Sequence, residues 1–404
     1  MSAHRPLADF AGAPLLPLIV AFLMLQPLST DLYLASLPSL GTVFGAAPAT
    51  VQLTLSVFVM GFGGAQLVIG PLSDRFGRKP VLTAGLGLYV LASLLCAAAP
   101  DIGLLVAARF LQALGCCSAI VIARAIVRDA WRDEDAPHVI ARASTWLSAA
   151  PLLGPILGSY LQVAFGWRAA FVFLSLLSAA LLALVVVRLP ETNRHKNPRA
   201  TDLGGLVASY RAVLGARAFW AHALPGALSY GTLFTFISGS SVVLIRVLQV
   251  PTQYFGFCFA FGVSGYLAGT LVCRRLLPRF GAARTLHIGS AGSLVAGLLF
   301  VAAVAAGLAH WATVLAAMFL MLFAHGINFP VAQSGSVTPF PKQAGTAAGL
   351  MGALVMGAAF VVGTAVGASF DGTLRPLAGI AALLAALLFA AVRLLAPLPR
   401  VVPA

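Results

Sequence analysis

The chain has 404 residues, of which 60% are hydrophobic and only 9% are charged. A soluble protein of this length needs about 25% charged residues to cover its surface, so most of this surface must face lipid. The net charge of +14 does not indicate nucleic-acid binding, because the basic residues lie in short gaps between apolar runs and not on one face of a soluble fold. The composition predicts an integral membrane protein.

Apolar runs follow one another along the whole sequence. A helix that crosses about 30 Å of hydrocarbon needs about 20 apolar residues. The sequence offers twelve such runs: 15–37, 50–72, 80–100, 102–124, 142–164, 168–189, 218–241, 252–275, 285–308, 311–333, 344–369 and 376–396. We therefore expect an all-α integral membrane fold with twelve transmembrane helices.

Basic residues concentrate in alternate gaps between these runs. Arg75, Arg78 and Lys79 follow the second run, and four more arginines follow the eighth, whereas the gaps on the other side hold few. Because loops rich in Lys and Arg stay in the cytoplasm, this alternation predicts that both termini are cytoplasmic.

The segment 190–217 is the one long polar stretch and is expected to link two six-helix halves, 1–189 and 218–404. A shift of 204 residues lays Arg75, Phe76 and Gly77 on Arg279, Phe280 and Gly281. Chance alignment of glycines and leucines is the alternative, but the Arg-Phe-Gly match falls in the same loop of each half. Two related halves with a site between them are typical of parallel-repeat transporters.

A charged loop follows the second run. A loop that only stayed in the cytoplasm would explain its Arg and Lys, but not the acid and the glycine among them. Charges here can bind neighbouring helix ends, and Arg78 can pair with Asp129 at the foot of the fourth run. We expect a conformational latch made by Gly70, Asp74, Arg75, Gly77, Arg78 and Asp129. The second half has Pro278 at the acid position, so only the first copy can form it.

Spans four and five carry further patterns. Span four contains Arg109, Gln112 and Gly115, and span five contains Pro151, Gly154, Pro155 and Gly158. Small residues and prolines permit close helix contact and a bend. Ordinary packing of small residues is the alternative interpretation.

These segments carry a family resemblance. The stretch from Gly70 to Lys79 resembles the G-x-x-x-D-R-x-G-R-K loop of the major facilitator superfamily. The stretch from Arg109 resembles its R-x-x-Q-G-x-G motif, with Ala113 replacing one glycine. The stretch from Pro151 resembles its G-P-x-x-G antiporter motif. Finer matches at Asp31-Leu32-Tyr33-Leu34 and Leu189-Pro190-Glu191-Thr192 resemble the bicyclomycin and chloramphenicol resistance group of drug–proton antiporters.

The resemblance implies two pseudo-symmetric six-helix halves in a bacterial inner membrane. It implies alternating access that exports a small amphipathic or drug-like substrate in exchange for protons. A proton-coupled importer of a sugar or amino acid, and a membrane sensor without net transport, are the alternatives. Neither the substrate nor the proton stoichiometry can be read from the sequence.

The energy source and the cofactors can be addressed from the residues. None of the three lysines is followed by Ser or Thr, so the sequence has no G-x-x-x-x-G-K-[ST] loop for ATP. The five cysteines form no CxxC pair and are expected to be small apolar filler. We expect a monomeric transporter, not an enzyme, with no metal and no cofactor.

Asp31 is the one acidic residue clearly inside a span, and none occurs between Asp202 and Asp371. An ionised side chain at the bilayer centre costs at least about 2.5–3.5 kcal/mol and is a functional hypothesis by default. Arg109 can reach a similar depth from the outer end of span four. We predict that Asp31 carries the proton and pairs with Arg109. The alternative is that Asp31 caps a broken helix together with Ser29 and Thr30.

A small-molecule pocket usually combines aromatic bodies with a few polar groups. The candidates for lining it are Tyr33, Gln52, Gln112, Trp146, Tyr230, Phe234, Phe236, Asn328, Phe329 and Gln333, although many of them could face lipid instead. Arg124 has either a functional role or a snorkelling one, and His222 and His325 are expected to pack between helices.

Overall fold

The computed structural model describes residues 15–131, 135–147 and 149–395, and within these ranges every regular element is helical. The first group of helices is α1 (Leu15–Asp31), α2 (Leu37–Phe44), α3 (Pro48–Phe76), α4 (Arg78–Ala98), α5 (Ile102–Ala130), α6 (Ala136–Leu147), α7 (Ala150–Phe165) and α8 (Arg168–Arg188). The second group is α10 (Arg217–Ser241), α11 (Thr252–Ala305), α12 (Trp311–Val337), α13 (Ala344–Ser369) and α14 (Arg375–Leu395). Between the two groups lies α9 (Leu203–Leu214).

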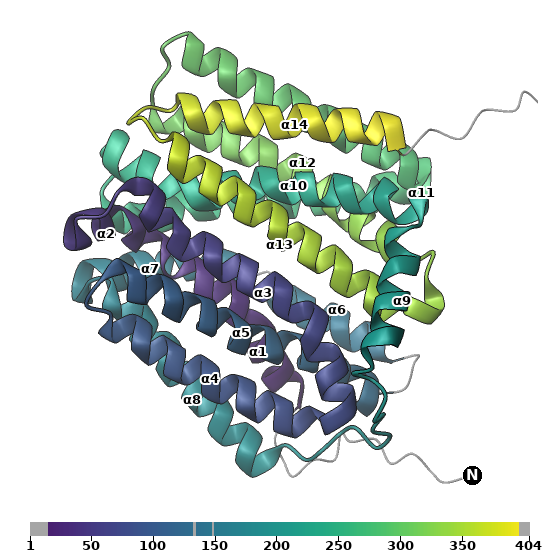
Figure 1. The fold of residues 1–404 in the computed structure, drawn as a ribbon. Coiled ribbons are helices and arrows are strands. Elements are labelled where there is room, and N and C mark those ends of the chain that lie inside the picture. The colour runs from purple at the N-terminus through teal and green to yellow at the C-terminus, as the bar shows by residue number, and fades with distance from the viewer. Residues whose placement is uncertain (1–14, 132–134, 148, 396–404) are drawn as a thin grey trace, which may run out of the picture.

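The helices pack mainly within these two groups, purple to blue and teal to yellow in Figure 1. Helix α3 packs along α13, and α7 packs against α11, so these two pairs join the groups. The described helices account for the twelve predicted crossings, because α11 crosses twice, α1 continues into α2, and α6 and α7 together make one crossing. We call the two ends of the bundle the α2 end and the α9 end (Figure 1).

Two predicted spans are wrong as continuous helices. Helix α1 ends at Asp31, and the chain then passes through a 3-10 turn, Leu34–Ser36, into α2. Pro27 lacks a backbone donor, and the Thr30 hydroxyl lies 2.9 Å from both the Pro27 carbonyl oxygen and the Asp31 carboxylate, so that it competes with the backbone for the Pro27 oxygen and favours a local break. The fifth span is divided into α6, which ends at Leu147, and α7, which begins at Ala150, because Pro151 at the start of α7 has no backbone N–H to continue the hydrogen bonding of α6.

The internal repeat appears in the backbone. Helices α3 and α4 meet at Gly77, which has a φ of 110°, and α11 bends at Gly281, which has a φ of 73°. These two glycines are the pair that the shift of 204 residues aligns. A positive φ is readily adopted only by glycine, so both halves use glycine for the same turn.

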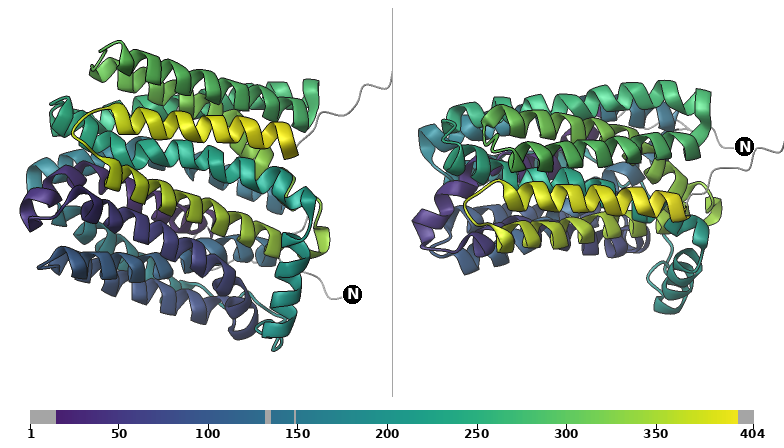
Figure 2. Two further views of the ribbon diagram at one scale, coloured as in Figure 1. Left: turned by 45° about the horizontal axis from the view of Figure 1, so that its top comes forward. Right: turned by 90° about the horizontal axis from the view of Figure 1, so that it is seen from above.

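The predicted linker contains a helix that the sequence analysis did not foresee. Helix α9 begins after Asp202, whose carboxylate accepts a hydrogen bond from the Gly205 backbone N–H at 2.8 Å. It runs across the ends of the other helices, and Figure 2 shows it outside the outline of the bundle.

Candidate functional site

Asp31 lies at the break that ends α1 and is only 4% exposed. The Thr30 hydroxyl donates to its carboxylate at 2.9 Å, and no described residue forms a salt bridge with it. The Asp31 carboxylate also lies within electrostatic range of the phenol of Tyr230 on α10. Asp31 therefore belongs to the first group of helices and lies near the second.

The glycines of span five form the wall beside Asp31. A Cβ atom added to Gly154 would lie 3.1 Å from the Asp31 Cβ, and one added to Gly158 would collide with the Leu32 backbone. On the other side of α7, a Cβ atom added to Gly256 of α11 would lie 2.6 Å from the Pro155 carbonyl oxygen. The glycine–proline motif thus brings α7 against both the broken end of α1 and the second group.

Arg109 does not pair with Asp31, and that prediction is wrong. Its side chain is completely buried within the first group. The guanidinium donates to the backbone oxygens of Ser29 at 3.0 Å and Thr54 at 3.1 Å, and to Gln112 Oε1 at 2.6 Å. Nε and Nη1 bind these acceptors, and Nη2 is buried without a hydrogen-bond partner among the described residues, whereas the Asp31 carboxylate lies against Gly154 of α7.

The Arg109 cluster also contains two predicted substrate residues. Tyr33 lies under the guanidinium, and its hydroxyl shares a hydrogen bond with Thr54 at 2.8 Å. Gln112 donates to Ser93 at 2.8 Å. Both side chains are fully buried in this network, so their contacts are structural ones within the first group.

The remaining predicted substrate residues do not gather in one pocket. Phe236 stacks on Phe300, and the Asn328 amide donates to Ser293 at 3.1 Å, both inside the second group. Trp146 is 65% exposed, and Gln333 is exposed as well. Tyr230 lies beside Phe234, with their rings stacked at 6.3 Å, and beside Phe329 at 5.9 Å.

Tyr230 belongs to an aromatic cluster that surrounds His325, which is 2% exposed. The His325 ring lies 6.1 Å from Tyr230, 5.5 Å from Tyr266 and 5.0 Å from Phe329. Its Nδ1 atom shares a hydrogen bond with the Ser229 hydroxyl at 2.9 Å. Tyr266 was not among the residues predicted from the sequence. His325 and Phe329 are four residues apart on α12, which places their rings on one face of that helix.

The charged loop after α3 is bonded to three other segments. The predicted ion pair is present: Arg78 Nε donates to Asp129 Oδ2 at 2.9 Å, while Nη1 binds Asp74. We missed Glu191, whose carboxylate accepts from the backbone N–H groups of Arg78 at 2.8 Å and Lys79 at 3.3 Å. Glu191 lies directly after span six, which was the available sequence signal for a role in this loop. No local pattern indicates that its side chain reaches the start of α4.

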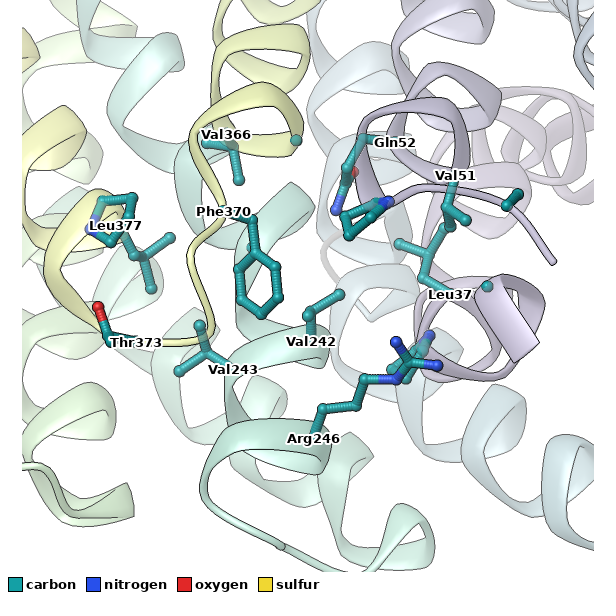
Figure 3. A pocket seen from close by; sticks show the side chains of 17 residues that line it. Leu37, Val51, Gln52, Val242, Val243, Arg246, Val366, Phe370, Thr373 and Leu377 are labelled. Carbon is teal, nitrogen blue, oxygen red and sulfur yellow. The ribbon is translucent and has the colours of Figure 1, made fainter.

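A pocket of about 570 Å³ that includes space open to solvent lies at the α2 end, between the two groups (Figure 3). Its walls are mostly apolar, and its polar side chains include Gln52 and Arg246. Gln52 closes its inner side, where Nε2 donates to the Ser238 carbonyl oxygen at 2.5 Å. Of the predicted substrate residues, Gln52 alone lines this pocket.

Other predicted residues stand apart from these sites. Arg124 is exposed, and no described residue forms a hydrogen bond or ion pair with it. His222 lies 3.3 Å from the Ala218 carbonyl oxygen. The five cysteines are free, and the described part of the chain holds no group of three His, Cys, Asp or Glu side chains that could bind a metal.

The chain matches the family model of the Major Facilitator Superfamily over residues 19–364. It is 27% identical to a bicyclomycin resistance protein homolog of Haemophilus influenzae, over 88% of this chain and 89% of that one. It is 31% identical to a chloramphenicol resistance protein of Pseudomonas aeruginosa, over 81% and 78% of the two chains. Its fold is similar to that of the xylose transporter XylE from E. coli, with a TM-score of 0.69 and 16% identity over 94% and 97% of the two chains. The chain therefore belongs to the Major Facilitator Superfamily, and within it to the bicyclomycin and chloramphenicol resistance type.

Proposed function

We propose that this protein exports small drug-like molecules across a bacterial inner membrane in exchange for protons. The observation that carries the proposal is the placement of Asp31: a buried carboxylate, without an ion-pair partner among the described residues, lies at a helix break against Gly154 of α7, the helix that packs against α11 of the second group. We expect a change in its charge to act on this contact between the two groups of helices. The resistance proteins among the relatives support export of drug-like compounds.

In this mechanism the halves 1–189 and 218–404 rock against each other, joined by the linker 190–217. Asp31 takes a proton from the outside. The neutral carboxyl group can then be buried against α7 and α10, away from water, at a lower free-energy cost than the charged one. Deprotonation on the cytoplasmic side restores the charge and favours the open arrangement again. Arg109 does not take part as an ion-pair partner. It holds α1, α3 and α5 together through the Ser29 and Thr54 backbone oxygens.

The substrate is expected to bind between Asp31 and the aromatic cluster of α10 and α12. Tyr230, Phe234 and Phe329 present apolar ring faces, and Asp31 and Ser229 supply polar atoms. Such a combination suits small amphipathic molecules. We place the α9 end in the cytoplasm, because the arginine-rich loops and the linker lie there, and we expect the monomer to be the working unit.

The loop from Gly70 to Lys79 is proposed to act as a latch on the same side. Arg78 joins the end of α3 to the end of α5 through Asp74 and Asp129, and Glu191 holds the start of α4. These bonds lie far from Asp31, so the latch should set the conformational equilibrium and not the affinity for substrate.

The function can be tested in everted membrane vesicles that are energised by respiration. Proton pumping acidifies their lumen, and an exporter then accumulates substrate there. With one proton exchanged for a neutral molecule, 100 mV supplies about 2.3 kcal/mol, which sustains a gradient of roughly 40-fold. Labelled chloramphenicol in a panel of drugs should accumulate, and an uncoupler should abolish the accumulation while ATP depletion alone should not. Accumulation in right-side-out vesicles instead would indicate an importer, and loss on ATP depletion alone would contradict secondary transport.

A further inference from the structure

Helix α9 has two apolar faces, and only one of them contacts the bundle. Val213 is completely buried, and the Tyr210 hydroxyl donates to the Leu67 carbonyl oxygen on α3 at 2.8 Å. The adjoining face remains uncovered: Leu203 is 76% exposed, Val207 46% and Leu214 36%. The spacing of four and eleven residues places these three side chains in one stripe along the helix.

The position of α9 relates this stripe to the membrane. The helix runs across the ends of the spanning helices and lies beyond the outline of the bundle (Figures 1 and 2). Val68 of α3, next to the Leu67 that α9 contacts, is 54% exposed and belongs to a span that must face lipid. The uncovered stripe and the exposed Val68 thus both lie at the α9 end of the molecule.

The charges around α9 are strongly basic. Five basic residues and two acids lie in the linker: Arg194, Lys196, Arg199, Arg211 and Arg217, with Glu191 and Asp202. Both acids are already engaged, because Glu191 accepts from α4 and Asp202 accepts from the start of α9. Arg211 is exposed on the flank of the apolar stripe.

The aromatic side chain of Trp220 lies at the end of α9. The Trp220 indole N–H donates to the Leu214 carbonyl oxygen, the last of α9, at 2.7 Å. Tryptophan and tyrosine are enriched where a membrane meets water, because their rings are apolar and their tips polar. Tyr210 lies on α9 and Trp220 lies against its last residue, so we expect the helix to sit at the depth of the interface.

We propose that α9 is an interfacial helix that binds the surface of an anionic phospholipid leaflet. Leu203, Val207 and Leu214 enter the boundary between headgroups and acyl chains. Arg211, with Arg199 and Arg217 nearby in sequence, binds the lipid phosphates. An amphipathic helix with a basic flank is the arrangement that such surfaces attract.

Lipid binding at α9 would act on the latch. The chain just before α9 is bonded to the loop after α3: the Asn197 N–H donates to the Asp74 carbonyl oxygen at 3.0 Å, and Arg75 binds the Thr201 hydroxyl. The position of α9 on the leaflet thus determines how this segment holds the loop. Only this step rests on the proposed transport function, and we expect turnover to rise with the content of anionic lipid.

Nitroxide labels test the membrane contact without any transport measurement. Val207→Cys places a label on the stripe, and Ala212→Cys places one on the opposite, exposed face; the five buried or half-buried native cysteines give the background signal. In vesicles of phosphatidylcholine and phosphatidylglycerol, the label at position 207 should collide with oxygen and the one at 212 with a water-soluble nickel chelate. Equal access of the chelate to both positions would overturn the proposal. So would spin–spin broadening at position 207, which would show a second copy of the chain on the stripe.

The headgroup contact is tested by titrating the purified protein with short-chain phosphatidylglycerol and following the label at position 207. One basic residue near an anionic surface contributes about a fivefold change in affinity. Arg211→Ala should therefore raise the dissociation constant about fivefold, Arg211→Lys should leave it nearly unchanged, and short-chain phosphatidylcholine should give no response. An unchanged constant in Arg211→Ala, or equal binding of both lipids, would contradict the proposal even if transport is normal.

Discussion

The Cβ atom of Asp31 lies 3.1 Å from the point where a side chain on Gly154 would begin. One turn further along α7, Gly158 faces the backbone of Leu32 in the same way. The helix break at Asp31 therefore fits only against a helix without side chains at these two positions. The candidate proton carrier and the glycine–proline motif form a single structural unit.

Gly158→Ala should separate α1 from α7, because the new Cβ atom would overlap the Leu32 carbonyl oxygen and a backbone cannot move aside as a side chain can. We expect a loss of about 1–3 kcal/mol in stability and near-complete loss of efflux. Gly357→Ala is the matched control, because nothing lies within 4 Å of its Cβ position. Thermal melting and vesicle transport measure the two effects. Equal behaviour of the two variants would mean that close approach of α1 and α7 is not required.

Gln52→Leu should loosen the α2 end of the molecule, where the Gln52 amide joins α3 to Ser238 of α10. Loss of one buried hydrogen bond costs about 1–2 kcal/mol, which corresponds to roughly a 5- to 30-fold shift toward the conformation open at that end. Spin labels at Val43→Cys and Thr373→Cys, both exposed, should move apart. Gln162→Leu is the control, because its amide binds Ser39 and Ser36 within the first group. Unchanged distances in Gln52→Leu would show that this bond does not hold the end closed.

The sequence predicted what depends on composition and local pattern. Apolar runs gave the twelve crossings, and the spacing within the charged loop gave the pair of Arg78 with Asp129. The break after Asp31 was only an alternative, because it depends on competition between side-chain hydroxyls and Pro27. The role of Glu191 could not be foreseen, because its partner Arg78 is 113 residues away. The predicted bond between Arg109 and Asp31 failed because depth along a helix does not fix the direction in which a side chain points.

Glu191→Gln should slow turnover and leave substrate affinity unchanged. The carboxylate of Glu191 holds the first N–H groups of α4, and a negative charge at a helix N-terminus contributes about 0.3–1 kcal/mol, so a two- to fivefold decrease in rate is expected. Asp101→Asn is the control, because Asp101 caps α5 away from the latch. Equilibrium binding and transport rate are measured on the same preparations. A large loss of affinity would place Glu191 in the binding pathway instead.

Arg109→Lys should disturb folding and not the pH dependence of transport. A lysine retains the charge but cannot reach the oxygens of Ser29, Thr54 and Gln112 together as the guanidinium does. Partial loss of buried, charge-assisted hydrogen bonds predicts about 2–4 kcal/mol of destabilisation. Arg168→Lys, at an exposed arginine that donates to a backbone oxygen, should cost far less. A stable Arg109→Lys protein whose pH profile has moved would indicate that Arg109 interacts with Asp31 during transport.

Asp31→Asn should remove proton coupling while the binding site persists. Asparagine matches the protonated acid in shape and charge, and its side-chain oxygen can still accept the hydrogen bond from Thr30. Uphill accumulation should disappear, downhill exchange should remain and become independent of pH, and addition of substrate should no longer release protons from the purified protein. Asp101→Asn, an exposed carboxylate at the other end of α5 from Asp129, should retain all three properties. If Asp31→Asn still drives uphill efflux with an unchanged pH profile, the proton must travel elsewhere. His325 then becomes the next residue to test, because it is buried beside Tyr230, which also lies near Asp31.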